Sequence, residues 1–308
     1  MTIPIILDCD PGHDDAIAIL LAAAHPDIDL RAITTVAGNG SLEKVTLNAR
    51  RVCTLAGVLD VPIAAGASGP SDGELDAAVD VHGESALDGP DLPEPAVDLD
   101  PRPAHELLAS ALRAAAEPLT VVATGPLTNV AAMLEAVEPE AVREVVWMGG
   151  TTGRGNRLPY AEFNAATDPA AAAAVLASGV PFTMLGLNLT HQALATDDVV
   201  AGILALGTPL AETVAGWLTF FGGTYKTLFG FDAPPVHDPC AVALVAEPGV
   251  VRCVDAFVAI ETEGRWTRGA TVVDLDGRLG RAPNARVAVE LDVTRFWSLV
   301  TAAVERLG

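Results

Sequence analysis

Residues 3–15, IPIILDCDPGHDD, join a short apolar run to four carboxylates, and this junction decides the fold class. Residues 3–7 are a continuous apolar run of the length of a buried parallel strand. A helical pattern follows at once over residues 14–24. A buried strand that leads through a tight turn into a helix is the first half of a βαβ unit, so the segment predicts an α/β protein.

The same alternation of strand and helix continues along the chain. Strands are expected at 3–7, 30–36, 119–123, 145–148, 182–185, 254–260 and 287–291, and helices at 14–24, 42–56, 129–136, 169–177, 197–206, 210–228, 239–246 and 294–306. This order predicts one domain, 1–308, built on an open, mostly parallel, doubly wound sheet with a Rossmann-like core and flanking helices. In such sheets ligands bind beyond the carboxyl ends of the strands, where we expect the functional site.

Composition excludes several classes of partner. The 308 residues carry a formal net charge of −22 and only 18 Lys and Arg, so a phosphate backbone would find few cationic contacts and no nucleic-acid partner is expected. No apolar run reaches the roughly 18 to 20 residues of a membrane helix. The N-terminus has neither a basic region nor a cleavage motif of a secretory signal, which favours a cytoplasmic protein.

Two further features of the chain concern charge and thiols. Residues 71–101 contain ten Asp or Glu and no Lys or Arg, and we expect a long acidic loop at about 71–102. The four cysteines have no paired spacing and stand among apolar residues, which suits reduced core thiols.

The aspartates of the opening segment need a positive partner. Asp8, Asp10, Asp14 and Asp15 fall within eight residues, and no Lys or Arg occurs in residues 1–30. Like charges this close raise one another's pKa, and carboxylate oxygens are the ligands of hard metal ions, so a metal site is expected. The alternative is helix capping, with Asp10 as N-cap and Pro11 at the first helical position, but capping does not need four aspartates.

Other polar residues also follow predicted strands. Asn39, the 124–129 segment, Met148 and Asn188 each come after a strand, so they should converge on the same edge of the sheet. Asp238 precedes Pro239 and a helix, so it is either an N-cap or a ligand, and a capping carboxylate has a second oxygen free.

Three side chains after a Gly-rich segment suit a sugar. Asn156, Glu162 and Asn164 supply acceptors and donors for vicinal hydroxyls, if 162–164 is extended so that Glu162 and Asn164 point the same way. Phe220, Phe221, Tyr225 and Phe229 have helical spacing, which is typical of core packing, although Tyr225 is a candidate ligand contact. His82 lies in the acidic loop, where a solvated histidine is the default, and His237 suits proton transfer near neutral pH.

Taken together these motifs resemble those of the nucleoside hydrolases, calcium-dependent enzymes that cut the bond between ribose and a nucleobase. The resemblance extends over nearly the whole chain and rests on DCDPGHDD at 8–15, TTVAGN at 34–39, HGES at 82–85, TGPLTN at 124–129, MGG at 148–150, AEFN at 161–164, LTHQ at 189–192 and VHDP at 236–239.

The resemblance implies the metal and the catalytic residues. Asp10, Asp15, Asp238 and the backbone carbonyl of Thr124 would hold a calcium ion, Ca²⁺, and Asp10 would be the general base that deprotonates a calcium-bound water. Calcium acidifies water weakly, so a carboxylate must take the proton. The transition state would be oxocarbenium-like and stabilised by the carboxylates, while His237 would protonate the leaving base.

The resemblance also implies the substrate contacts and a nucleoside as the small-molecule partner. Asp14, Asn39, Asn156, Glu162, Asn164 and Asp238 would bind the ribose hydroxyls with Met148 near the ring, and His82, Phe163 and Tyr225 would line the base pocket. A homodimer or homotetramer is implied as well. Members that prefer inosine and uridine commonly carry two tyrosines one turn apart where this chain has Phe221 and Tyr225, so pyrimidine ribosides or a broad range is expected ahead of strict purine specificity.

Two alternatives remain open at this point. A magnesium-dependent phosphohydrolase of the haloacid dehalogenase type also begins with a strand ending in Asp-x-Asp, but it needs a Thr or Val where this chain has Gly12, and a lysine for phosphate. A calcium-stabilised nucleoside- or sugar-binding protein without turnover would use the same ligands.

Overall fold

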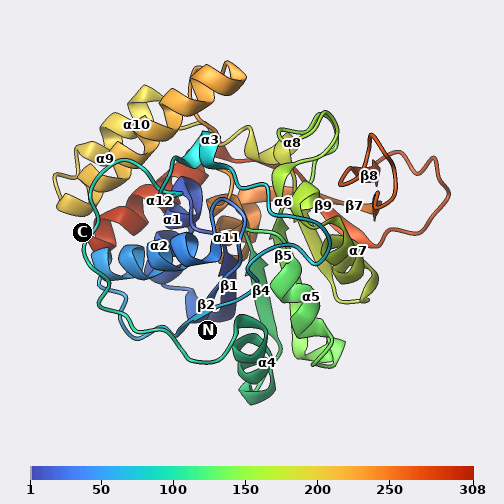
Figure 1. The fold of residues 1–308 in the computed structure, drawn as a ribbon. Helices are drawn as coiled ribbons and strands as arrows, with labels where there is room; N and C mark the ends of the chain where they lie inside the picture. Colours follow the sequence, from blue (N-terminus) through green and yellow to red (C-terminus); the bar gives the residue numbers. More distant parts are fainter. Residues whose placement is uncertain (1) are drawn as a thin grey trace.

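Strand β1 (Ile3–Cys9) lies inside a nine-stranded sheet in the computed structural model, which describes residues 2–308 (Figure 1). The strand order is β3-β2-β1-β4-β5-β6-β9-β7-β8. From β3 to β9 neighbouring strands are parallel, whereas β7 pairs antiparallel with β9 and β8 with β7. The mostly parallel α/β fold predicted from the sequence is therefore confirmed. The other strands are β2 (Ile28–Thr35), β3 (Ile63–Ala65), β4 (Leu119–Ala123), β5 (Val142–Met148), β6 (Phe182–Leu185), β7 (Val251–Ile260), β8 (Thr271–Asp274) and β9 (Ala285–Leu291).

Helices cover both faces of the sheet, because the residues of β1 alternate between two buried clusters. Ile5 and Leu7 pack in one cluster and Ile6 in the other. Figure 1 shows α1, α2 and α12 on one side of the sheet and α4, α5 and α7 on the other. The helices are α1 (His13–Ala24), α2 (Leu42–Leu55), α3 (Val79–His82), α4 (Ala104–Ala114), α5 (Thr128–Leu134), α6 (Phe163–Thr167), α7 (Pro169–Ala177), α8 (Leu187–Thr190), α9 (Asp197–Leu204), α10 (Pro209–Phe229), α11 (Pro239–Ala246) and α12 (Val293–Leu307).

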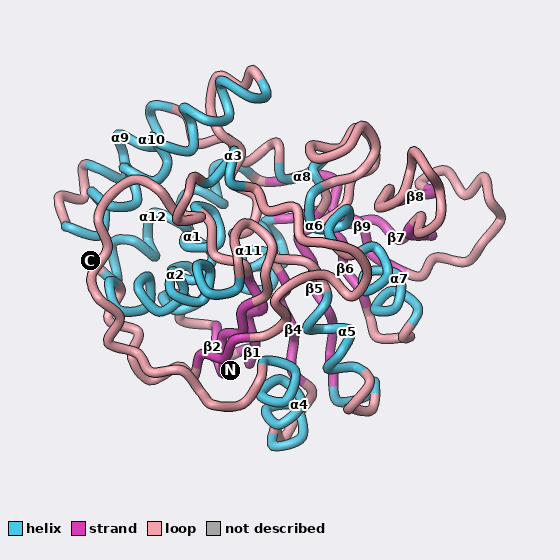
Figure 2. The backbone as a smooth tube through the Cα atoms, viewed as in Figure 1, coloured by secondary structure: helices cyan, strands magenta, loops and turns pink. Residues whose placement is uncertain are grey.

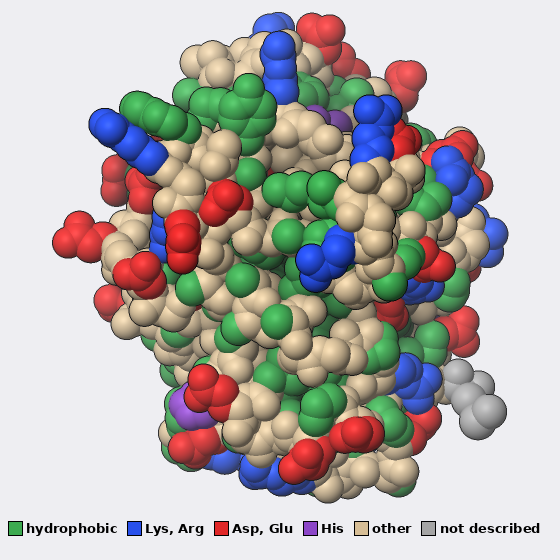
Figure 3. All heavy atoms as spheres, turned by 90° about the vertical axis from the view of Figure 1, so that its right-hand side faces the viewer, with side chains coloured by type: hydrophobic (Ala, Val, Ile, Leu, Met, Phe, Trp, Pro, Cys, Tyr) green, Lys and Arg blue, Asp and Glu red, His purple; other side chains and the backbone are tan. Residues whose placement is uncertain are grey.

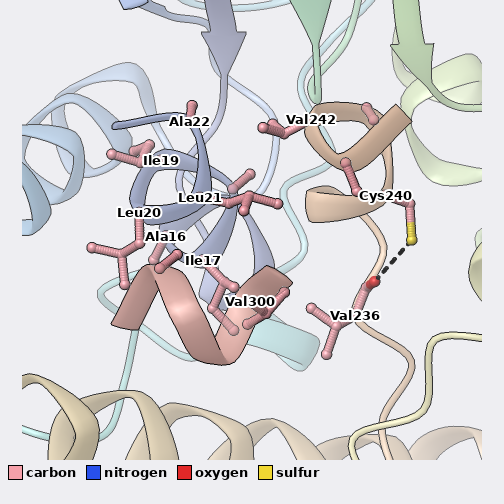
Figure 4. Packing of buried hydrophobic residues seen from close by; sticks show 14 of the residues in the cluster. Ala16, Ile17, Ile19, Leu20, Leu21, Ala22, Val236, Cys240, Val242 and Val300 are labelled. Atoms are coloured by element: carbon pink, nitrogen blue, oxygen red, sulfur yellow. Dashed lines mark hydrogen bonds between the residues drawn. The ribbon is translucent and has the colours of Figure 1, made fainter. Parts of the chain in front are cut away.

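Helix α1 is buried nearly all round, and this burial fixes the carboxylates of its first turn. Its apolar side chains meet Val242 of α11 and Val300 of α12 (Figure 4). Truncating a leucine such as Leu20 in a cluster of this kind costs about 2 to 5 kcal/mol, so the helix has little freedom to shift. Asp14 and Asp15 are therefore held in place by the core.

The start of α1 differs from the capping alternative. The N-cap is Gly12, not Asp10, and the helix begins at His13, after Pro11. The Gly12 N–H donates to Asp15 Oδ2 over 3.0 Å, so Asp15 is the residue that caps the helix through its side chain. Asp238 is at the N-cap position of α11, but its side chain accepts no capping hydrogen bond from the helix.

Two strands, β3 and β8, and four α-helices, α3, α4, α6 and α8, were not predicted from the sequence. Strands β3 and β8 have three and four residues, too few for a periodic pattern. Helix α4 begins right after Pro103, next to the acidic stretch, and its apolar stripe was not distinguished from that stretch.

The acidic stretch runs between β3 and α4, and Figure 2 shows that it is mostly loop, interrupted by the one-turn helix α3. Its beginning is fixed by Ser71, which donates to Asp168 through N–H and Oγ over 2.7 Å each. Its end returns to the sheet, where Leu99 forms a bridge with Ile63. Within residues 2–308 no helix is both long and apolar enough to cross a membrane.

Candidate active site

A cavity of about 230 Å³ lies beyond the carboxyl ends of the parallel strands. It forms where the turns after β1, β2, β4 and β5 meet α3, α6, α10 and the turn before α11. All ten residues predicted to bind substrate line it, which brings together positions from 14 to 238. The lining residues are Asp14, Asn39, Ala78, Asp80, Val81, His82, Thr124, Met148, Asn156, Arg157, Glu162, Phe163, Asn164, Phe221, Tyr225, Leu228, Phe229, His237 and Asp238.

Three buried carboxylates meet at one side of this cavity. One oxygen each of Asp14, Asp15 and Asp238 lie within 4.8 Å of one another. Burial, and next the Asp15 charge, raises the pKa of Asp14 to about 7. Burial also raises the pKa of Asp15, and burial followed by the Asp14 charge raises the pKa of Asp238 well above its usual value. Three such groups without a basic partner fit a hard cation.

Asp10 lies beside this group but not within it. Its Oδ2 accepts the Asn39 N–H over 2.7 Å, while its Oδ1 is buried and has no hydrogen-bond partner in the described chain. Burial and then the Asp15 charge raise the pKa of Asp10 well above its usual value. A carboxylate oxygen that is buried and unpaired is costly, so Oδ1 is free to take a water, a proton or a cation.

Asp8 has a different environment and supports the strand ends. Its Oδ1 accepts from Thr34 Oγ1 over 2.6 Å and from Asn129 Nδ2 over 2.8 Å, which ties β1 to β2 and to α5. Burial raises its pKa to about 7. Asp8 does not line the cavity.

Thr124 joins the carboxylates to the opposite wall. Its Oγ1 donates to Asp15 Oδ1 over 2.7 Å, and its backbone carbonyl accepts from Asn164 Nδ2, also over 2.7 Å. This side chain and carbonyl therefore face the cavity between Asp15 and Asn164.

The predicted ribose contacts also hold each other in place. Residues 163–167 form α6 rather than an extended segment, and Glu162 is its N-cap. The Glu162 carboxylate accepts N–H bonds from Gly150, Asn164 and Ala165 over 2.8 to 3.1 Å, and burial raises its pKa to about 7. Both Glu162 and Asn164 still line the cavity, so the expected convergence holds although the local conformation was wrong.

His237 adjoins the carboxylates, since its backbone N–H donates to Asp14 Oδ2 over 3.2 Å, and its ring is fixed between two hydroxyls. Its Nδ1 lies 2.7 Å from Thr190 Oγ1 and its Nε2 lies 2.7 Å from the Tyr225 hydroxyl. Burial lowers the pKa of His237 well below its usual value and raises the pKa of Tyr225 well above its own. At neutral pH the pair is therefore a neutral imidazole and a protonated phenol.

His82 is buried and stacked, not solvated. Its ring packs against those of His13 and Phe221, and the three ring centroids lie 5.3 Å from one another. Its Nδ1 lies 3.0 Å from His13 Nδ1. Burial lowers the pKa of His82 well below its usual value. Phe221 and Tyr225, expected in the core by default, are buried but also line the cavity.

Several residues around the cavity were not predicted. His13 belongs to the opening motif, but its partner His82 lies 69 residues further along the chain, so the contact could not be predicted from the sequence. Thr190 lies in the LTHQ motif and Arg157 directly follows Asn156. Their position next to predicted site residues was the only indication in the sequence. Asp80, Val81 and Leu228 gave none.

Comparisons with known proteins point to one family. A family model described as inosine-uridine preferring nucleoside hydrolase matches residues 5–298. The pyrimidine-specific ribonucleoside hydrolase RihA of Escherichia coli O9:H4 (strain HS) is 46% identical over 304 residues, which cover 97% of each chain.

Solved structures of this kind have the same fold. The purine-preferring ribonucleoside hydrolase from Gardnerella vaginalis superposes with a TM-score of 0.92 at 29% identity, over 99% of this chain and 98% of that one. The plant nucleoside hydrolase PpNRh1 gives a TM-score of 0.91 at 27% identity and 99% coverage of both chains.

Proposed function

The chain belongs to the inosine-uridine preferring nucleoside hydrolase family and is a ribonucleoside hydrolase, and from that premise we propose that it releases free base and ribose from pyrimidine ribonucleosides. The observation that carries the proposal is the two-sided cavity. One wall holds carboxylates and amides suited to ribose hydroxyls, and the other holds rings suited to a planar base. The phosphohydrolase alternative is set aside, because the family match extends over residues 5–298.

We propose that the carboxylate group holds Ca²⁺. Asp15 and Asp238 belong both to the expected ligand set and to the group that meets within 4.8 Å, and Thr124 faces the same space. The unpaired Oδ1 of Asp10 and the raised pKa values of the group support a site built for a cation. When bound, Ca²⁺ would hold the attacking water and the ribose diol and offset the negative charge.

Asp10 is the proposed general base. Its Oδ2 is held by Asn39, so the carboxylate has a fixed orientation, and its raised pKa makes it a better proton acceptor than a surface aspartate. The proton of the attacking water would go to Oδ1. As the glycosidic bond breaks, positive charge develops on the ribose, and the carboxylates of Asp14 and Asp238 stabilise it.

Tyr225 and His237 are proposed to serve the leaving base together. The Tyr225 hydroxyl lines the cavity and keeps its proton because burial raises its pKa. His237 is hydrogen-bonded to that hydroxyl and can stabilise the phenolate that remains when the proton goes to the leaving base, while Thr190 fixes the other ring nitrogen. The sequence-based proposal of His237 as the acid thus becomes a pair in which Tyr225 faces the base.

The proposed preference for pyrimidines rests on the relatives. The 46% identical relative is pyrimidine-specific, whereas the purine-preferring structural relative is 29% identical. A cytoplasmic location and a homodimer or homotetramer stay predictions.

A panel of nucleosides tests the proposal. Uridine, cytidine, inosine and adenosine are incubated with the full-length protein, and free ribose is measured with calcium and with a chelator. We expect release from uridine and cytidine, at least about tenfold slower release from the purines, and loss of release in the chelator that added calcium restores. Binding of uridine without ribose release would instead show a binding protein, and release that resists the chelator would contradict the metal.

A further inference from the structure

Arg157 is the single Lys or Arg among the described residues that line the cavity. It lies between β5 and α6, directly after Asn156. Its guanidinium forms an ion pair with Asp76, to which Nε also donates over 3.0 Å, and Nη2 donates to the Asp76 carbonyl over 3.4 Å. A second ion pair joins Nη1 to Asp80 over 3.5 Å.

These contacts tie down a segment that has few others. In the described chain, all polar contacts that residues 73–80 make outside residues 73–83 go to Arg157. The next anchors before them are Ser71 on Asp168 and Asp72 on Arg268, and the next one after them is the His82 ring on His13. Arg157 thus spans the gap between two fixed points.

Charge explains why the segment needs a cation. Residues 71–80 carry four carboxylates and no basic residue, and they lie beside a cavity that already contains Asp14, Glu162 and Asp238. The guanidinium pairs with both Asp76 and Asp80 through its planar fork, which Lys cannot reproduce, and offsets one of their two charges. The Arg157 side chain is 24% exposed, and those of Asp76 and Asp80 are 81% and 52% exposed, so salt will screen these pairs.

The same segment carries one wall of the base pocket. Val81 and His82 of α3 line the cavity, and Ala78 and Val81 pack with Phe163 and Phe221. The Arg157 Cζ lies 5.9 Å from the centroid of the Phe163 ring, so one side chain contacts both the segment and the wall it packs against. The apolar contacts hold α3 in part, and the ion pairs supply the rest.

We propose that Arg157 is a positioning residue that holds residues 76–82 against the base side of the cavity, and so sets the affinity for the nucleoside. The inference rests on the proposed function for its kinetic consequence. Arg157 acts through Val81 and His82 and its donors are already taken by two carboxylates, so it does not serve as a receptor for an anionic substrate.

Steady-state kinetics with uridine test the proposal on Arg157→Met, which keeps an apolar stem over Phe163 and loses the charge. Arg268→Met is the matched control, because Arg268 pairs with Asp72 over 3.3 Å on the same loop but lies outside the main cavity. We expect KM of Arg157→Met to rise about 3- to 10-fold at low ionic strength with kcat changed less than about twofold, as for lost binding that is equal in ground and transition states. Arg268→Met should stay within about twofold of wild type.

Salt and the double variant sharpen the test. In about 1 M NaCl the KM of wild type should rise toward that of Arg157→Met, because the pairs are screened. Adding Arg157→Met to Asp76→Asn/Asp80→Asn should change KM little further, since the partners are already gone. An unchanged KM in Arg157→Met, or an equal rise in Arg268→Met, would overturn the proposal.

Hydrogen exchange separates this inference from the proposed function. The amides of Val81, His82 and Gly83, which bond to Ala78 and Val79 within the α3 turn, should exchange several-fold faster in Arg157→Met and not in Arg268→Met. If the wild-type protein hydrolysed no nucleoside, the proposed function would be wrong. Faster amide exchange in Arg157→Met would still support the proposal that Arg157 holds residues 76–82 in place. Unchanged exchange at these three amides would overturn it.

Discussion

Asp10 and Asp8 are buried aspartates two residues apart, and their different contacts indicate different roles. Both oxygens of Asp10 point toward the turns after β2 and β4, whereas Asp8 faces Thr34 and Asn129 between the strands. A base must reach the attacking water, and the unpaired Oδ1 of Asp10 lies against the turn after β4, where Thr124 lines the cavity. Asp8 also has one unpaired oxygen, Oδ2, but its other oxygen is held between the strands. The pair therefore offers a built-in comparison.

We predict that Asp10→Asn lowers kcat for uridine by at least about 10³-fold, because general base catalysis contributes roughly 10² to 10⁴. The amide keeps the shape and can still accept the Asn39 N–H, so the fold should remain. Asp8→Asn is the control: it should cost about 1 to 3 kcal/mol of stability through its buried amide while kcat stays within about tenfold. Retention of more than a tenth of the rate by Asp10→Asn would remove Asp10 as the base.

Tyr225→Phe should reproduce the effect of His237→Ala, because the two side chains share one hydrogen bond. For uridine we expect a loss of about 10²- to 10³-fold, and for p-nitrophenyl riboside, whose leaving group needs no proton, less than about tenfold. The double variant should be little worse than either single one. An equal loss on both substrates would show that Tyr225 shapes the cavity without assisting the leaving base.

At the scale of elements, the strands and helices that the sequence predicted are those with long apolar runs. Strands β1, β4 and β5 and helix α10 were placed within a few residues, because apolar runs mark the strands and helical spacing marks the helix. The four-residue strand β6 was placed at its observed bounds, 182–185. Strand β8 is an edge strand of four residues, and its pairing with β7 depends on a distant partner.

Site residues, too, could be predicted from the sequence only where a regular element places them. Residues directly after parallel strands, such as Asn39 and Met148, were predicted because topology brings strand ends together. Arg157 was not, because its partner Asp76 is 81 residues away in a loop without periodicity. Nothing in a single sequence marks such a pairing, so side-chain contacts between loops had to come from the structure.

Two turns at strand ends leave no room beside Asp10, which predicts the effect of a methyl group there. A Cβ at Gly38 would overlap Asp10 Oδ2, and one at Gly125 would lie 2.7 Å from Oδ1. Gly38→Ala should therefore displace the carboxylate and lower kcat about 10²-fold, the usual cost of misplacing a catalytic group by an ångström.

The control for Gly38→Ala is Gly223→Ala. Gly223 is exposed in α10 with no neighbouring atom within 4 Å of an added Cβ, so alanine should raise stability by up to about 1 kcal/mol and leave kcat unchanged. Wild-type activity in Gly38→Ala would contradict the assigned position of Asp10.

At the scale of the whole molecule, the surface and the site handle negative charge differently. On the face in Figure 3, Lys and Arg side chains are interspersed with Asp and Glu, so exposed charges have partners and solvent. The buried carboxyls at the strand ends have neither, and their pKa values are raised for that reason. A cation bound at the carboxylate site would therefore stabilise the protein more than one bound at the surface.

Calcium affinity should consequently increase with pH. A carboxyl whose folded pKa is raised to about 7, as for Asp14, binds a proton below that pH, and the proton must leave before the cation can bind. In chelator the same shift destabilises the folded state as pH rises from the unfolded pKa of 3.8 toward 7, because the unfolded chain ionises at lower cost.

We expect the Kd for Ca²⁺ to fall about tenfold per pH unit for each displaced proton between pH 5.5 and 7, and to level off above pH 7. Calorimetry in two buffers of different ionisation enthalpy measures the proton release, and the rise in Tm on adding calcium should be larger at pH 8 than at pH 5.5. Asp238→Asn should abolish the calcium-induced rise in Tm, and the control Asp276→Asn, at an exposed residue, should keep it. A calcium affinity that is equal at pH 5.5 and pH 8 would contradict a cation held by these carboxylates.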